Sequence, residues 1–205
     1  MAVFLDLDET LVHSICMSRL GWSKTNPYPA KIFTVEKAGT SLSVFLGKSA
    51  VVNESRKRLA VRLSNFTRTV LSDHIMCWRP GLKQFLKELS STGYAINVWT
   101  AASRLYADEV VRALGMYRYG LKLTLAAEDY PRGMTKSLRY LQDKRIVNRP
   151  LREMVIVDDR EEVKRVQPLR AVQIRPFKAA VSITPCAEKR ELDRVRGAIS
   201  LALKM

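Results

Sequence analysis

The chain opens with a short apolar run that ends abruptly in carboxylates. Ala2 to Leu5 is wholly apolar, and Asp6, Asp8 and Thr10 follow it at alternate positions. Residues two apart on a strand face the same way, so Asp6 and Asp8 begin on one side and stay close in the following loop. Two such carboxylates repel unless a cation or a shared proton separates them. The segment predicts a strand that ends in a catalytic loop, with one acid as nucleophile beside a divalent metal and the other as proton carrier.

Two later apolar runs end in the same manner. Tyr94 to Trp99 leads into Thr100, and Met154 to Val157 leads into Asp158 and Asp159. Ligands of an open parallel sheet lie beyond the carboxyl ends of its strands. The three runs therefore predict one site where three strands end, although Thr100 alone is also compatible with a helix cap and the Asp158-Asp159 pair with a polar turn.

Helices are expected between these strands. Apolar residues recur at helical spacing from Pro80 to Ser91 and from Ser103 to Leu114, and Gly93 and Gly115 follow the two segments. Further expected elements are a strand at 121–126, a helix at 135–144, a strand at 171–174 and a helix at 188–204. The alternation predicts an α/β fold with a doubly wound, Rossmann-like parallel sheet, and we expect residues 1–205 to form a single domain.

Residues 17–78 do not follow this alternation and read as a β-rich insert after the first strand. The segments 31–35 and 41–46 alternate in polarity around Lys37 to Thr40, which predicts a β-hairpin. A further strand is expected at 59–63 and another within 67–78. We expect this insert to shape access to the site.

The insert is strongly basic. The whole chain carries a formal net charge of +15, and Arg19 to Arg68 holds ten basic residues against two acidic ones, a local balance of +8. Such a surface attracts anionic partners in a salt-dependent way. The candidates are a multiply phosphorylated peptide, RNA and an anionic membrane surface, and the alternative is a solubilising surface with no specific ligand.

Other features of composition fit an intracellular enzyme domain. Cys16, Cys77 and Cys186 are widely spaced, which favours a reducing compartment such as nucleus, cytoplasm or mitochondrion, and Cys16 is expected to be a buried thiol. The apolar run at Met1 is too short for a secretory signal, and we expect neither a transmembrane segment nor an oligomer.

Five motifs together resemble a known superfamily. They are Asp6-Leu7-Asp8-Glu9-Thr10-Leu11-Val12-His13-Ser14, Arg79-Pro80-Gly81-Leu82, Trp99-Thr100-Ala101-Ala102, Lys136 within Arg132-Gly133-Met134-Thr135-Lys136-Ser137-Leu138, and Val157-Asp158-Asp159. The set resembles the haloacid dehalogenase superfamily. Within it, the set is most similar to the nuclear LIM interactor-interacting factor-like phosphatases, which act on phosphoserines of the RNA polymerase II C-terminal domain. The likeness covers residues 2–14 and about 79–177, and it does not extend to about 17–70.

The resemblance implies a role for each matching residue. Asp6 is expected to attack phosphorus and form an aspartyl phosphate, and Asp8 to protonate the leaving oxygen and then activate water. Thr100 and Lys136 are expected to hold the phosphoryl oxygens, with Thr10 and Ala101 beside them. Arg132 is equally compatible with a phosphate contact and with a turn in solvent. The expected cofactor is Mg²⁺, bound by Asp6, the main-chain carbonyl of Asp8 and Asp158, with Asp159 in or just behind that shell.

Three functions follow from these observations. The first is a Mg²⁺-dependent phosphatase that hydrolyses phosphoserine or phosphothreonine on protein substrates. The second keeps the chemistry but acts on a nucleic-acid end, a lipid or a small-metabolite phosphate. The third is a non-catalytic binding module, like the mitochondrial import-receptor subunit that shares the resembled fold. The presence of both Asp6 and Asp8 favours an enzyme.

Overall fold

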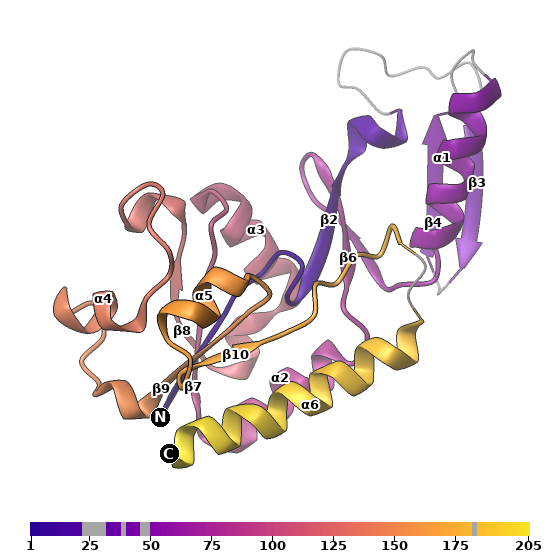
Figure 1. Ribbon diagram of the computed structural model, residues 1–205. Helices are drawn as coiled ribbons and strands as arrows, with labels where there is room; N and C mark the ends of the chain where they lie inside the picture. The colour runs from indigo at the N-terminus through magenta and orange to yellow at the C-terminus, as the bar shows by residue number, and fades with distance from the viewer. Residues whose placement is uncertain (22–31, 38–39, 46–49, 182–183) are drawn as a thin grey trace.

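A five-stranded parallel sheet organises the chain in this computed structural model, which describes residues 1–21, 32–37, 40–45, 50–181 and 184–205. The strands lie in the order β10-β9-β1-β7-β8. Their bounds are Ala2–Leu5 (β1), Ala95–Trp99 (β7), Leu121–Leu125 (β8), Met154–Asp158 (β9) and Ala171–Gln173 (β10). The predicted α/β fold with a parallel sheet is confirmed, and β1 lies at the centre of the sheet (Figure 1).

Helices cover both faces of the sheet. On one face, α2 (Leu82–Ser91), α3 (Arg104–Leu114) and α6 (Pro185–Lys204) share a buried cluster with the sheet. On the other face, α4 (Leu138–Asp143) and α5 (Glu161–Val166) contribute to a second cluster. Both sides of β1 are therefore buried, which explains why its sequence is continuously apolar rather than alternating.

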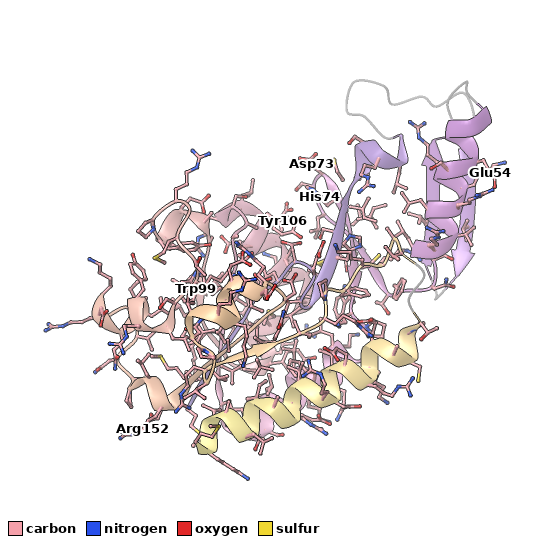
Figure 2. The ribbon with its side chains drawn as sticks, in the orientation of Figure 1. Glu54, Asp73, His74, Trp99, Tyr106 and Arg152 are labelled. Atoms are coloured by element: carbon pink, nitrogen blue, oxygen red, sulfur yellow. The ribbon has the colours of Figure 1, made fainter. Side chains whose placement is uncertain are left out.

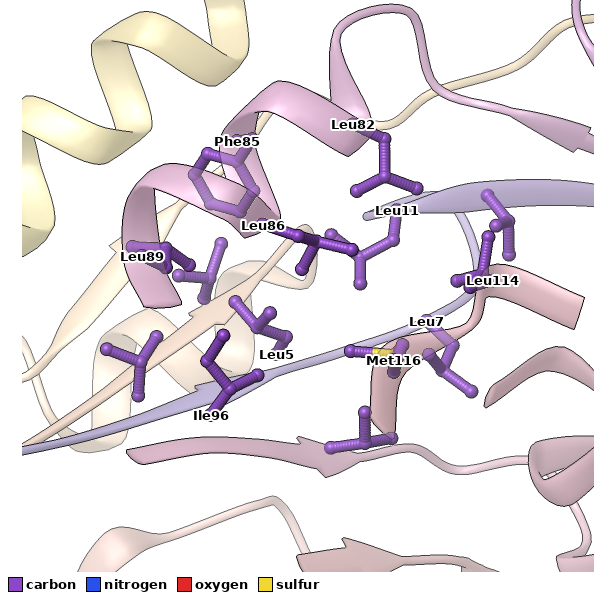
Figure 3. Packing of buried hydrophobic residues seen from close by; sticks show 14 of the residues in the cluster. Leu5, Leu7, Leu11, Leu82, Phe85, Leu86, Leu89, Ile96, Leu114 and Met116 are labelled. Atoms are coloured by element: carbon purple, nitrogen blue, oxygen red, sulfur yellow. The ribbon is translucent and has the colours of Figure 1, made fainter. Parts of the chain in front are cut away.

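The larger cluster joins the sheet to α2. Figure 3 shows Leu5, Leu7 and Leu11 gathered with the apolar side of α2, and all three are fully buried. The α2 residues of this cluster are Leu82, Phe85, Leu86 and Leu89, the face that helical spacing predicts. Gly93 follows the helix with a φ of +77°, in the left-handed region that glycine adopts without strain. This packing fixes the start of the loop that carries Asp6 and Asp8.

The other predicted core elements have small differences at their ends. The helix expected at 135–144 is shorter, because α4 begins at Leu138. The closing helix begins earlier than predicted, at Pro185, where Thr184 caps it by accepting from the N–H of Ala187 at 3.4 Å. Proline is well tolerated in a first helical turn, which explains the earlier start. The remaining short 3-10 helices are η1 Met17–Leu20, η2 Met116–Tyr119, η3 Ala127–Asp129 and η4 Leu151–Glu153.

In the described residues, the insert and the strand just before it form two small sheets and a helix. One antiparallel sheet has the order β2-β6-β5, formed by Val12–Cys16, His74–Trp78 and Arg68–Val70. The predicted hairpin is present as β3 (Ile32–Lys37) and β4 (Thr40–Phe45). Its turn at 38–39 and the two outermost residues of the prediction, 31 and 46, lie outside the described residues. The strand predicted at 59–63 is wrong, because these residues end α1, Ala50–Leu63. Their apolar members suit either element, and here Ala60 and Leu63 bury one side of α1 against Leu42 and Phe66.

The β2 strand was not predicted as an element. Its residues alternate weakly, and their partner β6 is about sixty positions away in the sequence, so local pattern alone does not reveal the pairing. Figure 1 shows β2 running from the region of the central sheet toward α1 and the hairpin. Within the described residues, no helix is long and apolar enough to cross a membrane.

Candidate active site

The register of the central sheet brings the three polar strand ends together. Leu5 pairs with Val98 on β7 and with Val157 on β9, and the N–H of Asp6 donates to the carbonyl of Val157 at 3.0 Å. Asp6 and Asp158 therefore follow or end adjacent strands at the same edge, and Thr100 leaves the neighbouring strand there. The site lies at the carboxyl ends of β1, β7 and β9, beside the central strand.

A tight loop holds the first two aspartates. The carbonyl of Leu7 accepts from the N–H groups of Thr10, Leu11 and Val12 at 3.3, 2.8 and 3.1 Å. Glu9 has a φ of +57°, a left-handed conformation that costs energy for a residue with a side chain. Its carbonyl accepts from the N–H of a distant residue, Phe177, at 2.6 Å. These bonds keep the loop closed around its turn.

Lys136 lies between two carboxylates of the site. Its Nζ donates to Asp6 Oδ1 at 2.5 Å and to Asp158 Oδ2 at 2.7 Å, and the lysine side chain is only 1% exposed. Burial alone would lower the pKa of Lys136, but the charges of Asp6 and Asp158 hold that pKa above its ordinary value. The buried ammonium is therefore charged and fixes both acids.

The negative charge of the clustered carboxylates is larger than the single positive charge of Lys136 that pairs with them. Burial raises the pKa of Asp6 against the opposing effect of Lys136, and burial followed by the Asp6 charge raises the pKa of Asp158. Burial and the charge of Asp158 likewise raise the pKa of Asp159. A further cation would relieve this crowding of buried carboxylates.

Three of these acids are arranged to share such a cation. Oxygens of Asp6, Asp158 and Asp159 all lie within 4.8 Å of one another. Mg²⁺ prefers oxygen ligands and is commonly held by one or two carboxylates and water. The donor set therefore fits the expected Mg²⁺, and the assignment of metal ligands stays a prediction. The N–H of Arg160 donates to Asp158 Oδ1 at 2.9 Å and orients that carboxylate.

The side chain of Asp8 has a different surrounding from Asp6. Its Oδ1 accepts from the Tyr106 hydroxyl at 2.5 Å, and the same hydroxyl lies 2.5 Å from Ser14 Oγ. Burial and then the Asp8 charge raise the pKa of Tyr106, so this phenol remains a protonated donor. Figure 2 shows Tyr106 close to His74, and their ring centroids are 5.6 Å apart.

Tyr106 is a candidate functional residue that the sequence interpretation missed. Its helical spacing places it among the apolar residues of α3, and this is compatible with burial of the ring but does not reveal the position of the hydroxyl. A cavity of about 330 Å³ is lined by Asp8, Tyr106 and their neighbours; the other lining residues are Ser14, His74, Ala102 and Ser103. Asp8 therefore lies at a cavity, where a leaving group has room.

The remaining predicted residues are not all equally close to the carboxylates. Thr10 is buried, and its Oγ1 donates to Asp159 Oδ1 at 3.4 Å. Thr100 is buried as well, and its Oγ1 accepts from the N–H of Ala102 at 3.1 Å. Ala101 and Arg132 are exposed. The substrate roles of these four residues stay predictions.

Arg79 binds the backbone of the loop that carries Asp6 and Asp8, a role that its sequence motif did not disclose. Its Nη1 donates to the carbonyl of Thr10 at 2.8 Å, and its Nη2 donates to the carbonyl of Arg175 at 2.7 Å. The same Nη2 lies 2.7 Å from Glu188 Oε2 on α6. The only available signal was an arginine directly before Pro80-Gly81, where the chain enters α2.

Comparison with known sequences identifies relatives along the whole chain. The family model described as NLI interacting factor-like phosphatase matches residues 1–195. The uncharacterized protein 037R of Frog virus 3 is 59% identical over 201 residues, which cover 98% of this chain and 96% of that protein. The putative CTD phosphatase-like protein 355R of Invertebrate iridescent virus 3 is 25% identical over 139 residues, which cover 60% of this chain and 73% of that protein.

A mitochondrial protein shares part of the sequence. The mitochondrial import inner membrane translocase subunit tim50 of Aspergillus fumigatus is 33% identical over 95 residues, which cover 46% of this chain and 18% of that protein. Less than half of this chain thus matches a small part of the translocase subunit.

Solved structures show the same fold at low sequence identity. The fission yeast RNA polymerase II CTD phosphatase Fcp1 superposes with a TM-score of 0.55 at 19% identity, covering all of this chain and half of that one. The putative beta-phosphoglucomutase of Thermotoga maritima gives a TM-score of 0.54 at 15% identity, with 98% of each chain covered. The haloacid dehalogenase-type fold is confirmed, and the chain belongs to the NLI interacting factor-like phosphatase family.

Proposed function

We propose that the protein is a Mg²⁺-dependent phosphatase that hydrolyses phosphoserine or phosphothreonine on protein substrates through an aspartyl phosphate on Asp6. One observation carries the proposal: two aspartates of the same loop, Asp6 and Asp8, have different neighbours. Asp6 is bonded to Lys136 and belongs to the three-carboxylate cluster, whereas Asp8 is bonded to a neutral phenol beside a cavity. Different surroundings allow neighbouring carboxyl groups to perform different tasks.

The first half-reaction transfers the phosphoryl group to the protein. A carboxylate oxygen of Asp6 bonds to phosphorus, the bond between phosphorus and the ester oxygen breaks, and Asp8 gives its proton to that oxygen. Burial raises the pKa of Asp8, and this favours the protonated form that the step requires. The Tyr106 hydroxyl holds the Asp8 carboxyl in place at 2.5 Å.

The second half-reaction regenerates the enzyme. Asp8 takes a proton from water, the water oxygen bonds to phosphorus, and the bond between phosphorus and Asp6 breaks to release inorganic phosphate. Lys136 and Thr100 would hold the phosphoryl oxygens during both steps. The contact of Lys136 with Asp6 and the position of Thr100 directly after β7 support these roles. Asp6, Asp158 and Asp159 would hold Mg²⁺, which supplies charge neutralisation between the anionic nucleophile and the anionic phosphate.

A protein substrate is supported by the family and by the shape of the site. The family model is that of a phosphatase, and one viral relative bears the name CTD phosphatase-like. The cavity beside Asp8 is bordered by β2 and by the start of α3, through Ser14 and Ser103. Residues that flank a phosphorylated serine can lie along this border while the phosphate reaches Asp6.

Hydrolysis of a generic aryl phosphate tests the chemistry, and a panel of phosphopeptides then tests the substrate class. We expect activity in wild type with Mg²⁺, loss of activity with a chelator, and loss in Asp6→Asn, which removes the nucleophile and almost no volume. Asp193→Asn is the matched control, because it makes the same change on the exposed side of α6. Full activity in Asp6→Asn would contradict the proposal, and activity on aryl phosphate and metabolites but on no phosphopeptide would contradict the protein substrate.

A binding module is the second candidate, and the partial match to the translocase subunit is the observation that favours it. A folded, Mg²⁺-loaded sample that hydrolyses neither aryl phosphate nor any phosphopeptide would support this alternative.

A further inference from the structure

A basic pocket lies on the insert, away from the carboxylate cluster. It has a volume of about 580 Å³ and lies between η1, α1 and the segment that contains Ala180. Its walls carry three arginines, Arg19, Arg58 and Arg62, against one acid, Glu54. The volume is in the range of small-ligand sites, which is about 300 to 1,000 Å³. The lining has more positive than negative side chains, so it favours an anionic ligand.

The pocket is partly pre-arranged. Arg62 Nη1 donates to the carbonyl of Ala180 at 3.0 Å, and this bond connects α1 to a segment far along the chain. Arg58 Nε lies 3.3 Å from Glu54 Oε1, one turn earlier on the same helix. Leu59 packs against the buried cluster of the insert and anchors this side of α1. Each guanidinium has five N–H donors, so both keep donors for a ligand.

These side chains favour phosphate over other anions. A guanidinium presents a planar pair of donors that matches two oxygens of a phosphate, and Ser55 adds a hydroxyl to the same lining. The described lining has no aromatic side chain on which a base could stack. A single phosphoryl group fits this lining better than a nucleic-acid strand.

One strand connects the pocket to the active site. Ser14 on β2 lines the cavity beside Asp8, and Arg19 follows it by five residues. Five residues span at most about 18 Å, and an extended peptide covers that distance with five or six of its own residues. A peptide that passes Ser14 can therefore reach Arg19 with a second phosphorylated side chain, and Arg58 and Arg62 line the same pocket as Arg19.

We propose that Arg19, Arg58 and Arg62 bind a second phosphoryl group of the substrate, so that the enzyme prefers peptides phosphorylated at two positions. This inference rests on the proposed protein phosphatase function. On this proposal, the basic residues of the insert contribute to substrate selection. The preference of the enzyme then depends on the number of residues between the two phosphates.

Steady-state kinetics on synthetic phosphopeptides test the proposal. The panel contains singly phosphorylated peptides and doubly phosphorylated ones with separations of two to eight residues. For wild type we expect one range of separations to have a KM roughly fivefold to tenfold lower than the single phosphopeptide, because the second phosphate gains charge-assisted hydrogen bonds. We expect the Arg19→Gln/Arg58→Gln variant to lose that preference while its kcat on aryl phosphate is unchanged.

A matched control separates this effect from a general loss of charge. Arg118→Gln/Arg152→Gln removes the same charge from exposed arginines on η2 and η4, and Figure 2 shows Arg152 and Glu54 at opposite ends of the molecule. The control variant should keep the preference for double phosphorylation. Fluorescence anisotropy with a labelled doubly phosphorylated peptide, measured in chelator so that no turnover occurs, should show weaker binding to the pocket variant and unchanged binding to the control.

Three results would overturn the inference. They are the absence of any preference for double phosphorylation in wild type, a preference that survives in the pocket variant, and stronger competition for the pocket by a 5′-phosphorylated oligonucleotide than by the peptide. Failure of the proposed function is distinct, because wild type would then hydrolyse neither aryl phosphate nor peptide. If only the pocket assignment is wrong, aryl phosphate and single phosphopeptides are still hydrolysed.

Discussion

Arg79 and Glu188 form a fully buried ion pair between the segment that precedes α2 and the C-terminal helix α6. Arg79 Nη2 lies 2.7 Å from Glu188 Oε2, and neither side chain is exposed to solvent. Through its other donors Arg79 binds the carbonyl of Thr10, so the pair connects the loop of Asp6 and Asp8 to α6. The fold thus stabilises its site from an element more than 170 residues away in sequence.

Breaking this pair is expected to destabilise the protein strongly. Glu188→Ala leaves the Arg79 guanidinium buried without its partner, and such changes cost about 3 to 5 kcal/mol. Urea unfolding followed by circular dichroism measures the loss. Glu161→Gln is the control, since its pair with Arg165 is exposed and should matter by less than about 0.5 kcal/mol. Equal stabilities of the two variants would contradict a structural role for the buried pair.

Tyr106→Phe should impair catalysis more than stability. The variant removes the hydroxyl that donates to Asp8 and that stabilises the carboxylate formed as Asp8 gives up its proton. Hydrogen bonds to charged groups are worth about 1.5 to 3 kcal/mol, or roughly 10-fold to 100-fold in rate. We expect kcat to fall by this order and to depend more steeply on leaving-group basicity, because Asp8 is the proton donor. Tyr117→Phe, on an exposed tyrosine, should leave kcat unchanged. An unaltered kcat in Tyr106→Phe would show that Asp8 needs no such support.

Magnesium should stabilise the folded protein, and more so at higher pH. Burial raises the pKa of Asp6 and of Asp158 above their values in the unfolded chain. A carboxyl of this kind adds stability below its unfolded pKa, and that stability is lost as the pH rises through the raised value. Bound Mg²⁺ offsets the loss, with a gain of about 2.7 kcal/mol at a hundred times its Kd.

Thermal unfolding with and without Mg²⁺ measures this effect. The shift in Tm should be larger at pH 7.5 than near pH 4.5, where protons compete with the metal. It should be lost in Asp158→Asn and retained in Asp193→Asn. An equal shift in wild type and Asp158→Asn would place the metal elsewhere.

The three cysteines should differ in their reaction with an alkylating reagent. Burial raises the pKa of Cys77 to about 12, so its thiolate is rare at pH 8. The expectation of a buried Cys16 is wrong, because its side chain is partly exposed at the end of β2, and hydrogen bonding to Ser18 lowers its pKa. Mass spectrometry after brief treatment with iodoacetamide should find Cys16 and the exposed Cys186 modified first. Early modification of Cys77 in the folded protein would contradict the burial of β6.

The sequence predicted the parts of the fold that depend on local pattern. The apolar runs of β1, β7 and β9 are recognisable because strands buried on both faces have continuous apolar sequence, and the face of α2 follows from its spacing. The insert was less predictable. Leu59 to Leu63 is compatible with a strand or a helix when its partners are unknown. The β2 segment forms a strand because it pairs with β6, which is distant in the sequence.

The residues of the candidate site also divide into those that local pattern predicts and those that depend on long-range contacts. Asp6, Thr100, Asp158 and Asp159 are at strand ends, so topology brings them to one edge of the sheet. Contacts made by long side chains across the sequence were not available from pattern. The resemblance implied that Lys136 holds phosphoryl oxygens, but its position between two acids was not predicted, and the hydroxyl of Tyr106 at Asp8 was missed.

Trapping of the phosphoenzyme tests the central claim most directly. During turnover of a phosphopeptide, rapid quenching and borohydride reduction convert a phosphorylated aspartate to homoserine, which peptide mass spectrometry locates. The account predicts homoserine at position 6. With an aryl phosphate as substrate the yield should be larger in Asp8→Asn, because this good leaving group needs little help from an acid while the second half-reaction still needs Asp8 as base. Modification at another aspartate, or full turnover with position 6 unmodified throughout, would contradict the assignment of Asp6 as the nucleophile.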